Sequence, residues 1–188
     1  DEANVVVCAS DSFGIRNQGA DVAEQIAAMH AIAARQKAEG GPPISVTFST
    51  AFGCPFDGEV PQDRVVSLAR EAAEAKVDEI ALADTIGVAD PWMVRDRVEA
   101  VKKVIGDIPL RLHFHDTRNT GLANAFAGVE AGVDILDASV GGLGRRGPRH
   151  PEVLPRRPGR RAGDAGRVRG TTAAGRLLPH RRRHARQC

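Results

Sequence analysis

Residues 79–115, EIALADTIGVADPWMVRDRVEAVKKVIGDIPLRLHFH, contain the pattern that decides the fold. A short apolar run at 79–83 is followed by a helical pattern from Pro91 to Ile105, and then by a second apolar run at 109–115. Short apolar runs predict buried strands, whereas a longer stretch with apolar residues three and four positions apart predicts a helix. We therefore expect a strand–helix–strand unit with parallel strands.

The same alternation continues on both sides of this unit. Further strands are expected at 5–9, 44–48 and 133–138, and further helices at 21–38, 61–76 and 121–131. Five strands and four helices in strict alternation fit either a doubly wound parallel sheet or a (β/α)₈ TIM barrel.

Polar residues at the ends of the predicted strands favour the barrel. Asp11, Cys54, Asp84 and the segments 115–116 and 141–142 lie at or just beyond strand C-termini, where a barrel builds its active site. No GxGxxG motif follows a strand, which argues against a dinucleotide-binding sheet. Because a complete barrel has eight strands, the five expected here predict an α/β fold that is a partial barrel.

The composition of the chain changes at about residue 144. Residues 1–144 carry 12 Lys and Arg against 22 Asp and Glu, whereas residues 145–188 carry 14 Arg, no Lys and 2 acidic residues. The second segment has too few apolar residues to form a core, so we expect a partial-barrel domain at 1–144 and a disordered Arg/Gly/Pro-rich tail at 145–188. Arginine without lysine is also what GC-rich DNA read out of frame would encode, and we prefer this explanation of the tail.

Composition also limits partners and location. The tail has no aromatic residue for base stacking, so a nucleic-acid partner is not expected. No apolar run of about 18 residues is present, and the first residues lack the basic and apolar parts of a signal peptide. The chain has only three cysteines, Cys8, Cys54 and Cys188, and a small, odd number does not indicate a disulfide framework. We expect a cytoplasmic protein with no membrane partner.

His113 and His115 are the sharpest chemical feature of the sequence. Alternate residues of a strand share one face, so both imidazoles are expected to point the same way. Two neutral imidazoles on one face are a pair of metal ligands, although a histidine can also simply satisfy a local hydrogen bond. Asp116 would be a further ligand or would orient one of the rings.

Other residues at the same edge each have a possible functional role and a simpler structural role. Asp84 would be a ligand or a base near the metal, or would only cap the loop that follows its strand. Cys54 would present a thiol, but a small buried side chain is the commoner role of a single cysteine. The glycines at 141–144 would let the backbone approach a ligand, or would only form the turn.

Five segments together resemble hydroxymethylglutaryl-CoA lyases, members of a superfamily of metal-dependent lyases and Claisen-type synthases. They are FGCPFDG at 52–58, ADTIGV at 83–88, HFHDT at 113–117, GLAN at 121–124 and DASVGGLG at 137–144. The resemblance covers about residues 4–144 and implies that the five strands correspond to strands four to eight of the barrel. The family's first-strand Arg–Asp pair, its loop cysteine and its downstream asparagine have no counterpart in this sequence.

The resemblance also implies a reaction and a site. The reaction is cleavage of 3-hydroxy-3-methylglutaryl-CoA to acetyl-CoA and acetoacetate, a step of leucine degradation and ketone-body formation. The resemblance implies an Mg²⁺ or Mn²⁺ ion held by His113 and His115, and a catalytic role in the active site for Asp84. Arg16 and Asn17, expected in the loop after the first strand, would contact the phosphates of an acyl-CoA substrate.

Two alternatives remain open from the sequence. A Claisen-type acyltransferase, such as an isopropylmalate or homocitrate synthase, would carry the same histidine pair. The chain would otherwise be an inactive truncated product of a lyase gene. In either case an open half-barrel exposes strand edges that can pair with another chain, so a homodimer is one expected assembly.

Overall fold

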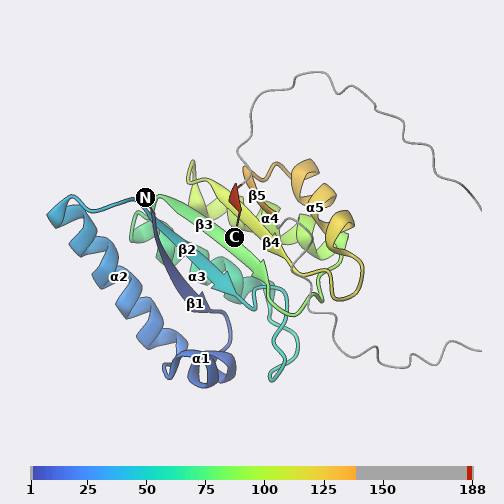
Figure 1. Cartoon of the computed structure of the whole chain (residues 1–188), viewed down its shortest axis with the longest axis horizontal. Coiled ribbons are helices and arrows are strands. Elements are labelled where there is room, and N and C mark those ends of the chain that lie inside the picture. Colours follow the sequence, from blue (N-terminus) through green and yellow to red (C-terminus); the bar gives the residue numbers. More distant parts are fainter. Residues whose placement is uncertain (1, 139–185, 188) are drawn as a thin grey trace, which may run out of the picture. The chain divides into compact units, whose positions relative to one another are not determined.

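A computed structural model describes residues 2–138 and 186–187 of the chain. These residues form one sheet in which the strand order follows the chain order and every neighbouring pair is parallel (Figure 1). The strands are β1 (Ala3–Cys8), β2 (Ile44–Ser49), β3 (Glu79–Asp84), β4 (Leu110–Phe114), β5 (Ile135–Ala138) and β6 (Arg186–Gln187).

Helices connect the first five strands. They are α1 (Asp11–Gln18), α2 (Val22–Glu39), α3 (Gln62–Glu74), α4 (Pro91–Ile105) and α5 (Gly121–Glu130). The predicted helices begin and end within two residues of these bounds, because their terminal signals are strong. Asp21 caps α2 in a capping box with Glu24, and Asp90 accepts the backbone N–H of Met93 ahead of Pro91.

The two faces of the sheet differ in polarity. One face contributes Phe48, Leu82 and Leu112 to a single core, which the buried residues of α2, α3, α4 and α5 complete. The alternate residues point to the opposite face, where the side-chain amide of Asn4 donates to the hydroxyl of Thr47 on the next strand at 3.0 Å. This open face is therefore polar, whereas the helix-covered face is apolar.

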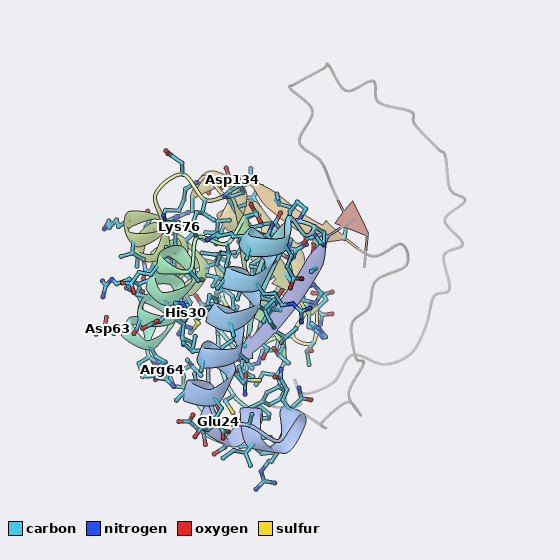
Figure 2. The ribbon with its side chains drawn as sticks, turned by 90° about the vertical axis from the view of Figure 1, so that its left-hand side faces the viewer. Glu24, His30, Asp63, Arg64, Lys76 and Asp134 are labelled. Carbon is cyan, nitrogen blue, oxygen red and sulfur yellow. The ribbon has the colours of Figure 1, made fainter. Side chains whose placement is uncertain are left out.

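The position of the helices confirms the partial barrel that the sequence predicts. A doubly wound sheet carries helices on both faces, whereas a barrel carries them only on its outside. Helices α2 to α5 share one core on one side of the sheet, and the two views agree with this arrangement (Figure 1, Figure 2). The described residues thus form part of a (β/α)₈ barrel, with the polar face as its inner wall.

Helix α1 was not expected from the sequence, and its presence corrects the predicted loop at Arg16 and Asn17. Ser10 caps the helix by accepting the backbone N–H of Phe13, and Gly19 ends it in the left-handed conformation. Gly14 lies inside the helix and is buried, and a Cβ at this position would clash with the side chain of Gln25. A short helix with an internal glycine and weak apolar periodicity gives little signal in the sequence.

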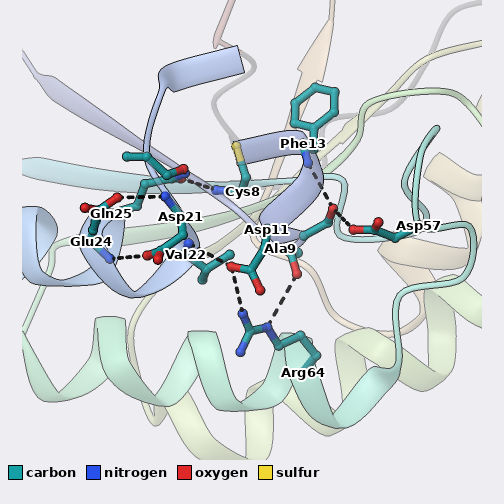
Figure 3. A network of polar contacts seen from close by, with 12 residues as sticks. Cys8, Ala9, Asp11, Phe13, Asp21, Val22, Glu24, Gln25, Asp57 and Arg64 are labelled. Carbon is teal, nitrogen blue, oxygen red and sulfur yellow. Dashed lines mark hydrogen bonds and ion pairs between the residues drawn. The ribbon is translucent and has the colours of Figure 1, made fainter. Parts of the chain in front are cut away.

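Polar contacts fasten the start of α1 to neighbouring elements (Figure 3). The carboxylate of Asp11 accepts the backbone N–H of Val22 at the start of α2. Arg64 of α3 donates to the carbonyl of Ala9 at 3.4 Å and lies 4.0 Å from Asp11. The hydroxyl of Ser10 lies 2.5 Å from Asp57 in the loop after β2. This end of the sheet is therefore closed by side-chain contacts between loops.

The rest of the chain adds two observations. Of the predicted tail at 145–188, only Arg186 and Gln187 are described, and they form β6 beside Asp137 and Ala138 of β5. The predicted glycine loop at 141–144 also lies outside the described residues. Within the described ranges, no helix has the length and apolar character needed to cross a membrane.

Candidate functional site

His113 and His115 lie at the carboxyl edge of β4 and line one cavity on the polar face of the sheet. Their ring centroids are 5.1 Å apart, with an angle of 64° between the ring planes. The cavity has a volume of about 370 Å³, within the range of small-molecule sites. Its wall is formed by Glu2, Asn4, Thr47, Ala83, Thr85, Arg111, His113, His115 and Asp137.

The environment of His115 favours its neutral form. Burial lowers the pKa of His115 and the neighbouring His113 lowers it further, whereas the negative charge of Asp84 acts in the opposite direction. A neutral imidazole keeps a lone pair that a metal ion can use, and an imidazolium does not. The ring is therefore ready to act as a ligand at neutral pH.

Asp137 of β5 contacts His113 directly. Its Oδ2 lies 3.1 Å from Nδ1 of the His113 ring, and both side chains are more than two-thirds buried. The pairing of β4 with β5 brings them together, because Leu112 lies opposite Leu136 and each of the two residues follows next in its strand. The sequence places Asp137 within the motif at 137–144 but indicates no role for it, since strand register cannot be read from the sequence.

Arg111 lines the same cavity and forms the centre of a charged cluster. Its Nε lies 3.0 Å from Oε1 of Glu79, and its Nη1 lies 3.8 Å from Oδ1 of Asp137. Glu2 approaches the same guanidinium at 3.8 Å. Burial raises the pKa of Glu79 although Arg111 acts to lower it. Arg111 was also missed from the sequence, but its place two residues before His113 on one strand face was a usable signal.

Asp84 is completely buried at the end of β3 and organises the loop that follows. Its Oδ1 accepts the backbone N–H of Val88 at 2.9 Å, and its Oδ2 accepts that of Ala89 at 3.0 Å. Burial raises the pKa of Asp84, and these backbone hydrogen bonds and the nearby His115 only partly offset the rise. These hydrogen bonds show the predicted role of Asp84 in capping the loop. Its side chain does not line the cavity, and its catalytic role stays a prediction.

Asp116 follows His115 and serves the next loop in a similar way. Its Oδ1 accepts the backbone N–H of Gly121 at the start of α5, at 2.8 Å. Gly121 has no room for a side chain, since an added Cβ would lie 2.9 Å from that carboxylate oxygen. Asp116 therefore closes the loop from β4 to α5.

Arg16 and Asn17 lie on the exposed side of α1, and neither lines the histidine cavity. The guanidinium of Arg16 stacks over the ring of Phe56, 4.5 Å from its centroid. Phe13 approaches the same ring with a centroid distance of 6.2 Å. The structure thus places the two predicted acyl-CoA contacts near the loop after β2 and apart from the two histidines.

Cys54 is buried at the margin of the hydrophobic core, as its simpler role predicts, and its thiol also contacts polar groups. Its Sγ lies 3.0 Å from the hydroxyl of Ser10 and accepts long contacts of 3.4 Å from the backbone N–H groups of Phe56 and Asp57. Hydrogen bonds from Ser10 and Ser12, with a smaller effect of Arg16, lower the pKa of Asp57. These contacts hold the loop after β2 in its closed shape.

The donor set around the cavity fits a divalent metal ion in part. Two imidazoles face one hollow, one of them is held neutral by burial, and the other has a carboxylate on its second ring nitrogen, as histidine ligands of metals commonly have. Among residues 2–138 and 186–187, no group of three or more His, Cys, Asp or Glu side chains is arranged to hold a metal. The described residues therefore offer two candidate ligands.

Comparison with protein families gives a match over most of the chain. The model of the family described as HMGL-like matches residues 1–163, which runs past the predicted domain boundary at 144. The (R)-citramalyl-CoA lyase of Chloroflexus aurantiacus is 39% identical over 140 residues, which cover 74% of this chain and 44% of that protein. A hydroxymethylglutaryl-CoA lyase of Bacillus subtilis is 42% identical over 96 residues, covering 51% of this chain and 32% of that protein.

Solved structures give the same result. An HMG-CoA lyase from Acinetobacter baumannii, in complex with coenzyme A and 3-methylmalate, matches with a TM-score of 0.71 and 36% identity. The match covers 76% of this chain and 46% of that one. The HMG-CoA lyase from Brucella melitensis matches with a TM-score of 0.72 and 33% identity, covering 77% and 50% of the two chains. The chain thus spans half or less of the length of these relatives.

Proposed function

The chain belongs to the HMGL-like family, and from this membership we infer that it forms part of a carbon–carbon lyase acting on a coenzyme A thioester. We propose 3-hydroxy-3-methylglutaryl-CoA as the substrate, with acetyl-CoA and acetoacetate as products. The observation that carries the proposal is the pair His113 and His115, which line a cavity at the edge of the sheet where barrels place their active sites.

His113 and His115 would hold an Mg²⁺ or Mn²⁺ ion. A bound divalent cation would supply Lewis-acid chemistry, polarising the oxygens of the substrate next to the bond that breaks. The neutral state of His115 and the contact of His113 with Asp137 support these two residues as ligands. Further ligands would come from groups other than the described His, Cys, Asp and Glu side chains, or from the substrate.

Other residues have supporting roles in the proposal. Asp84 is the proposed catalytic residue, and its support is its burial and its electrostatic interaction with His115. Arg16 and Asn17 are the proposed contacts to coenzyme A, because a cation and an amide on an exposed helix suit phosphate binding. A relative solved in complex with coenzyme A supports an acyl-CoA ligand. A cytoplasmic location and a homodimer complete the proposal.

A second substrate has one specific observation in its favour. The (R)-citramalyl-CoA lyase of Chloroflexus aurantiacus is 39% identical over 140 residues, a longer match than that of the Bacillus subtilis enzyme. Citramalyl-CoA is therefore the second candidate. The four relatives described above carry lyase names, which favours cleavage over a Claisen-type acyl transfer.

Metal binding to the 188-residue chain tests the proposed site. Titration calorimetry with Mn²⁺ is expected to show one site that is lost in His113→Ala and in His115→Ala. His30→Ala is the matched control, because His30 pairs with Glu71 on the outer helices and lies away from the cavity (Figure 2). Binding that survives both cavity substitutions would contradict the proposed ligands.

Cleavage is measured on the same proteins. Each of the two CoA thioesters is incubated with the chain and Mn²⁺ or Mg²⁺, and loss of thioester is followed by chromatography. The proposal expects cleavage that His30→Ala retains and His113→Ala removes. Cleavage that continues in His113→Ala would contradict it, and so would an Mn²⁺-loaded chain that cleaves neither thioester, since that result favours the inactive product.

A further inference from the structure

Within the described part of the chain, each oxygen of the Asp137 carboxylate faces a different side chain. Its Oδ2 lies 3.1 Å from Nδ1 of His113, and its Oδ1 lies 3.8 Å from Nη1 of Arg111. The side chains of Asp137 and Arg111 are each only 10% exposed, so water competes little for these contacts. Arg111 is held in turn by Glu79, whose Oε1 lies 3.0 Å from its Nε. The orientation of the carboxylate is therefore set from the side opposite the histidine.

The direction of the hydrogen bond follows from which groups can donate. An ionised carboxylate only accepts, so the proton between Asp137 and His113 must come from Nδ1 of the ring. A neutral imidazole carries one proton, and Nε2 is then left with a lone pair. Because His113 lines the cavity, this tautomer offers the lone pair of Nε2 to whatever the cavity holds.

We propose that Asp137 is a positioning residue that keeps His113 in its Nδ1–H tautomer and thereby presents Nε2 as a ligand. The consequence for metal binding rests on the proposed function, whereas the tautomer itself does not. Strand register makes the arrangement possible, because Arg111 and His113 alternate on β4 while Asp137 follows Leu136, the partner of Leu112, on β5. One carboxylate thus links a buried arginine to the histidine.

Asp137→Asn separates positioning from a merely structural role. The substitution changes the volume little, but the amide has one acceptor oxygen in place of two. Arg111 can only donate, so it is expected to take that oxygen and to turn the NH₂ group toward His113. The ring must then accept at Nδ1 and carry its proton on Nε2, which inverts the tautomer.

Asp134→Asn is the matched control. Asp134 lies just before the same strand, and its Oδ2 accepts the backbone N–H of Leu110 at 3.0 Å and contacts Lys102 at 3.4 Å. The residue joins β4 and β5 at their other end and does not line the cavity. It therefore reports what loss of a carboxylate that joins these two strands does to the fold alone, although Asp134 is more exposed than Asp137.

Nitrogen-15 NMR of the histidine rings measures the tautomer in the full chain without metal. Spectra are recorded at alkaline pH, and His113→Asn identifies the signals of this ring. We expect protonated Nδ1 in the wild-type and Asp134→Asn proteins and protonated Nε2 in Asp137→Asn. A wild-type His113 protonated on Nε2, or a tautomer that Asp137→Asn leaves unchanged in a folded protein, would overturn the inference.

Mn²⁺ titration of the same variants tests the link to the proposed function. Loss of a partner that orients a metal-bound histidine commonly lowers affinity about 10- to 100-fold, and we expect that range for Asp137→Asn and no comparable loss for Asp134→Asn. An inverted tautomer with unchanged Mn²⁺ affinity would overturn the role of Asp137 in presenting a ligand. If the wild-type chain binds no Mn²⁺, the proposed metal site fails, while the ring spectra still decide whether Asp137 sets the tautomer.

Discussion

Thr47 and Phe48 are neighbours on β2, but their side chains meet opposite surroundings. Phe48 is fully buried among the helices, whereas Thr47 lies on the polar face and accepts a hydrogen bond from Asn4. The same contrast appears on β4, where Leu112 is fully buried in the core and His113 lines the cavity. The helix-covered face therefore provides most of the burial, and the polar face provides the groups that can react or bind.

The comparison implies that stability and function can be changed separately along a strand. A residue of the core can be altered at a large cost in folding free energy, while its neighbour on the polar face can be altered with little cost. The loops at the carboxyl edge are the exception. There Asp84, Gly87 and Asp116 support the fold and border the histidines at the same time.

The largest expected effect separates the two faces directly. Phe48→Ala should lower the free energy of unfolding by about 3–5 kcal/mol, because it removes a fully buried ring from the core. Thr47→Ala is the control on the polar face and should cost about 1 kcal/mol, the value of one hydrogen bond. Urea denaturation measures both, and similar losses for the two variants would contradict the division into faces.

A smaller loss is expected where the two roles meet. Gly87 has a positive φ of 68°, and an added Cβ would lie 2.5 Å from Oγ1 of Thr117 and 2.8 Å from the carbonyl oxygen of His115. Gly87→Ala should therefore cost about 1–3 kcal/mol and should also weaken Mn²⁺ binding by displacing His115.

Gly40→Ala provides the control for backbone strain alone. Gly40 also has a positive φ, of 69°, but nothing lies within 4 Å of its added Cβ. Its replacement should cost about 1 kcal/mol and should leave Mn²⁺ affinity unchanged. Equal effects of the two glycine substitutions on Mn²⁺ affinity would mean that the loop at Gly87 does not support the site.

The polar face should also show its own dependence on pH. Burial raises the pKa of Glu79 above its ordinary value of 4.5, so the folded state holds this proton more tightly than the unfolded state. The group therefore contributes stability that is present below that ordinary value and is lost as the pH rises through the folded pKa. Glu79→Gln should gain stability relative to the wild type as the pH rises from below 4.5 to neutral.

Denaturation midpoints measured across that pH range test the expectation. Glu39→Gln is the control, because Glu39 is well exposed at the end of α2 and pairs only with the exposed Arg35 in the contacts described. It measures how far removal of an exposed carboxylate alone changes the denaturation midpoint. A difference between Glu79→Gln and the wild type that is constant or reversed would contradict the assigned direction.

The smallest expected effect on stability is at α1. The exposed stacking of Arg16 on Phe56 should contribute about 0.5–1 kcal/mol, so Arg16→Ala should barely change the denaturation midpoint. If Arg16 contacts coenzyme A as proposed, the same variant should lose affinity for it in a direct titration. Arg35→Ala removes another exposed arginine and should keep the affinity for coenzyme A. If Arg16→Ala and Arg35→Ala bind coenzyme A equally well, Arg16 is not part of the proposed site.

Strand and helix positions could be predicted because their signals are local. Apolar runs such as 79–83 and cap residues such as Asp90 and Pro91 act within a few positions, and the elements agree with the prediction within about two residues at most ends. Helix α1 was missed because its local signals are weak. It is short, its apolar residues show little helical spacing, and it contains an internal glycine, Gly14.

The candidate site was only partly predictable because it depends on pairing between strands. The histidine pair could be placed on one face from its spacing alone. The contact of Asp137 with His113, and the cluster around Arg111, required the register of β4 against β5. The alternation of strands and helices fits both a barrel and a doubly wound sheet, and the polar residues at the strand ends were what favoured the barrel.

The register between β4 and β5 also limits how the chain can change in length. Inserting or deleting one residue between α5 and β5 would shift β5 by one position, unless the turn at 131–134 absorbed the change. Such a shift exchanges the two faces of a strand, so the carboxylate of Asp137 would move into the core and Leu136 or Ala138 would face His113. This short turn should therefore tolerate substitutions more readily than changes in length, and natural variants should differ there in residue type while keeping the count.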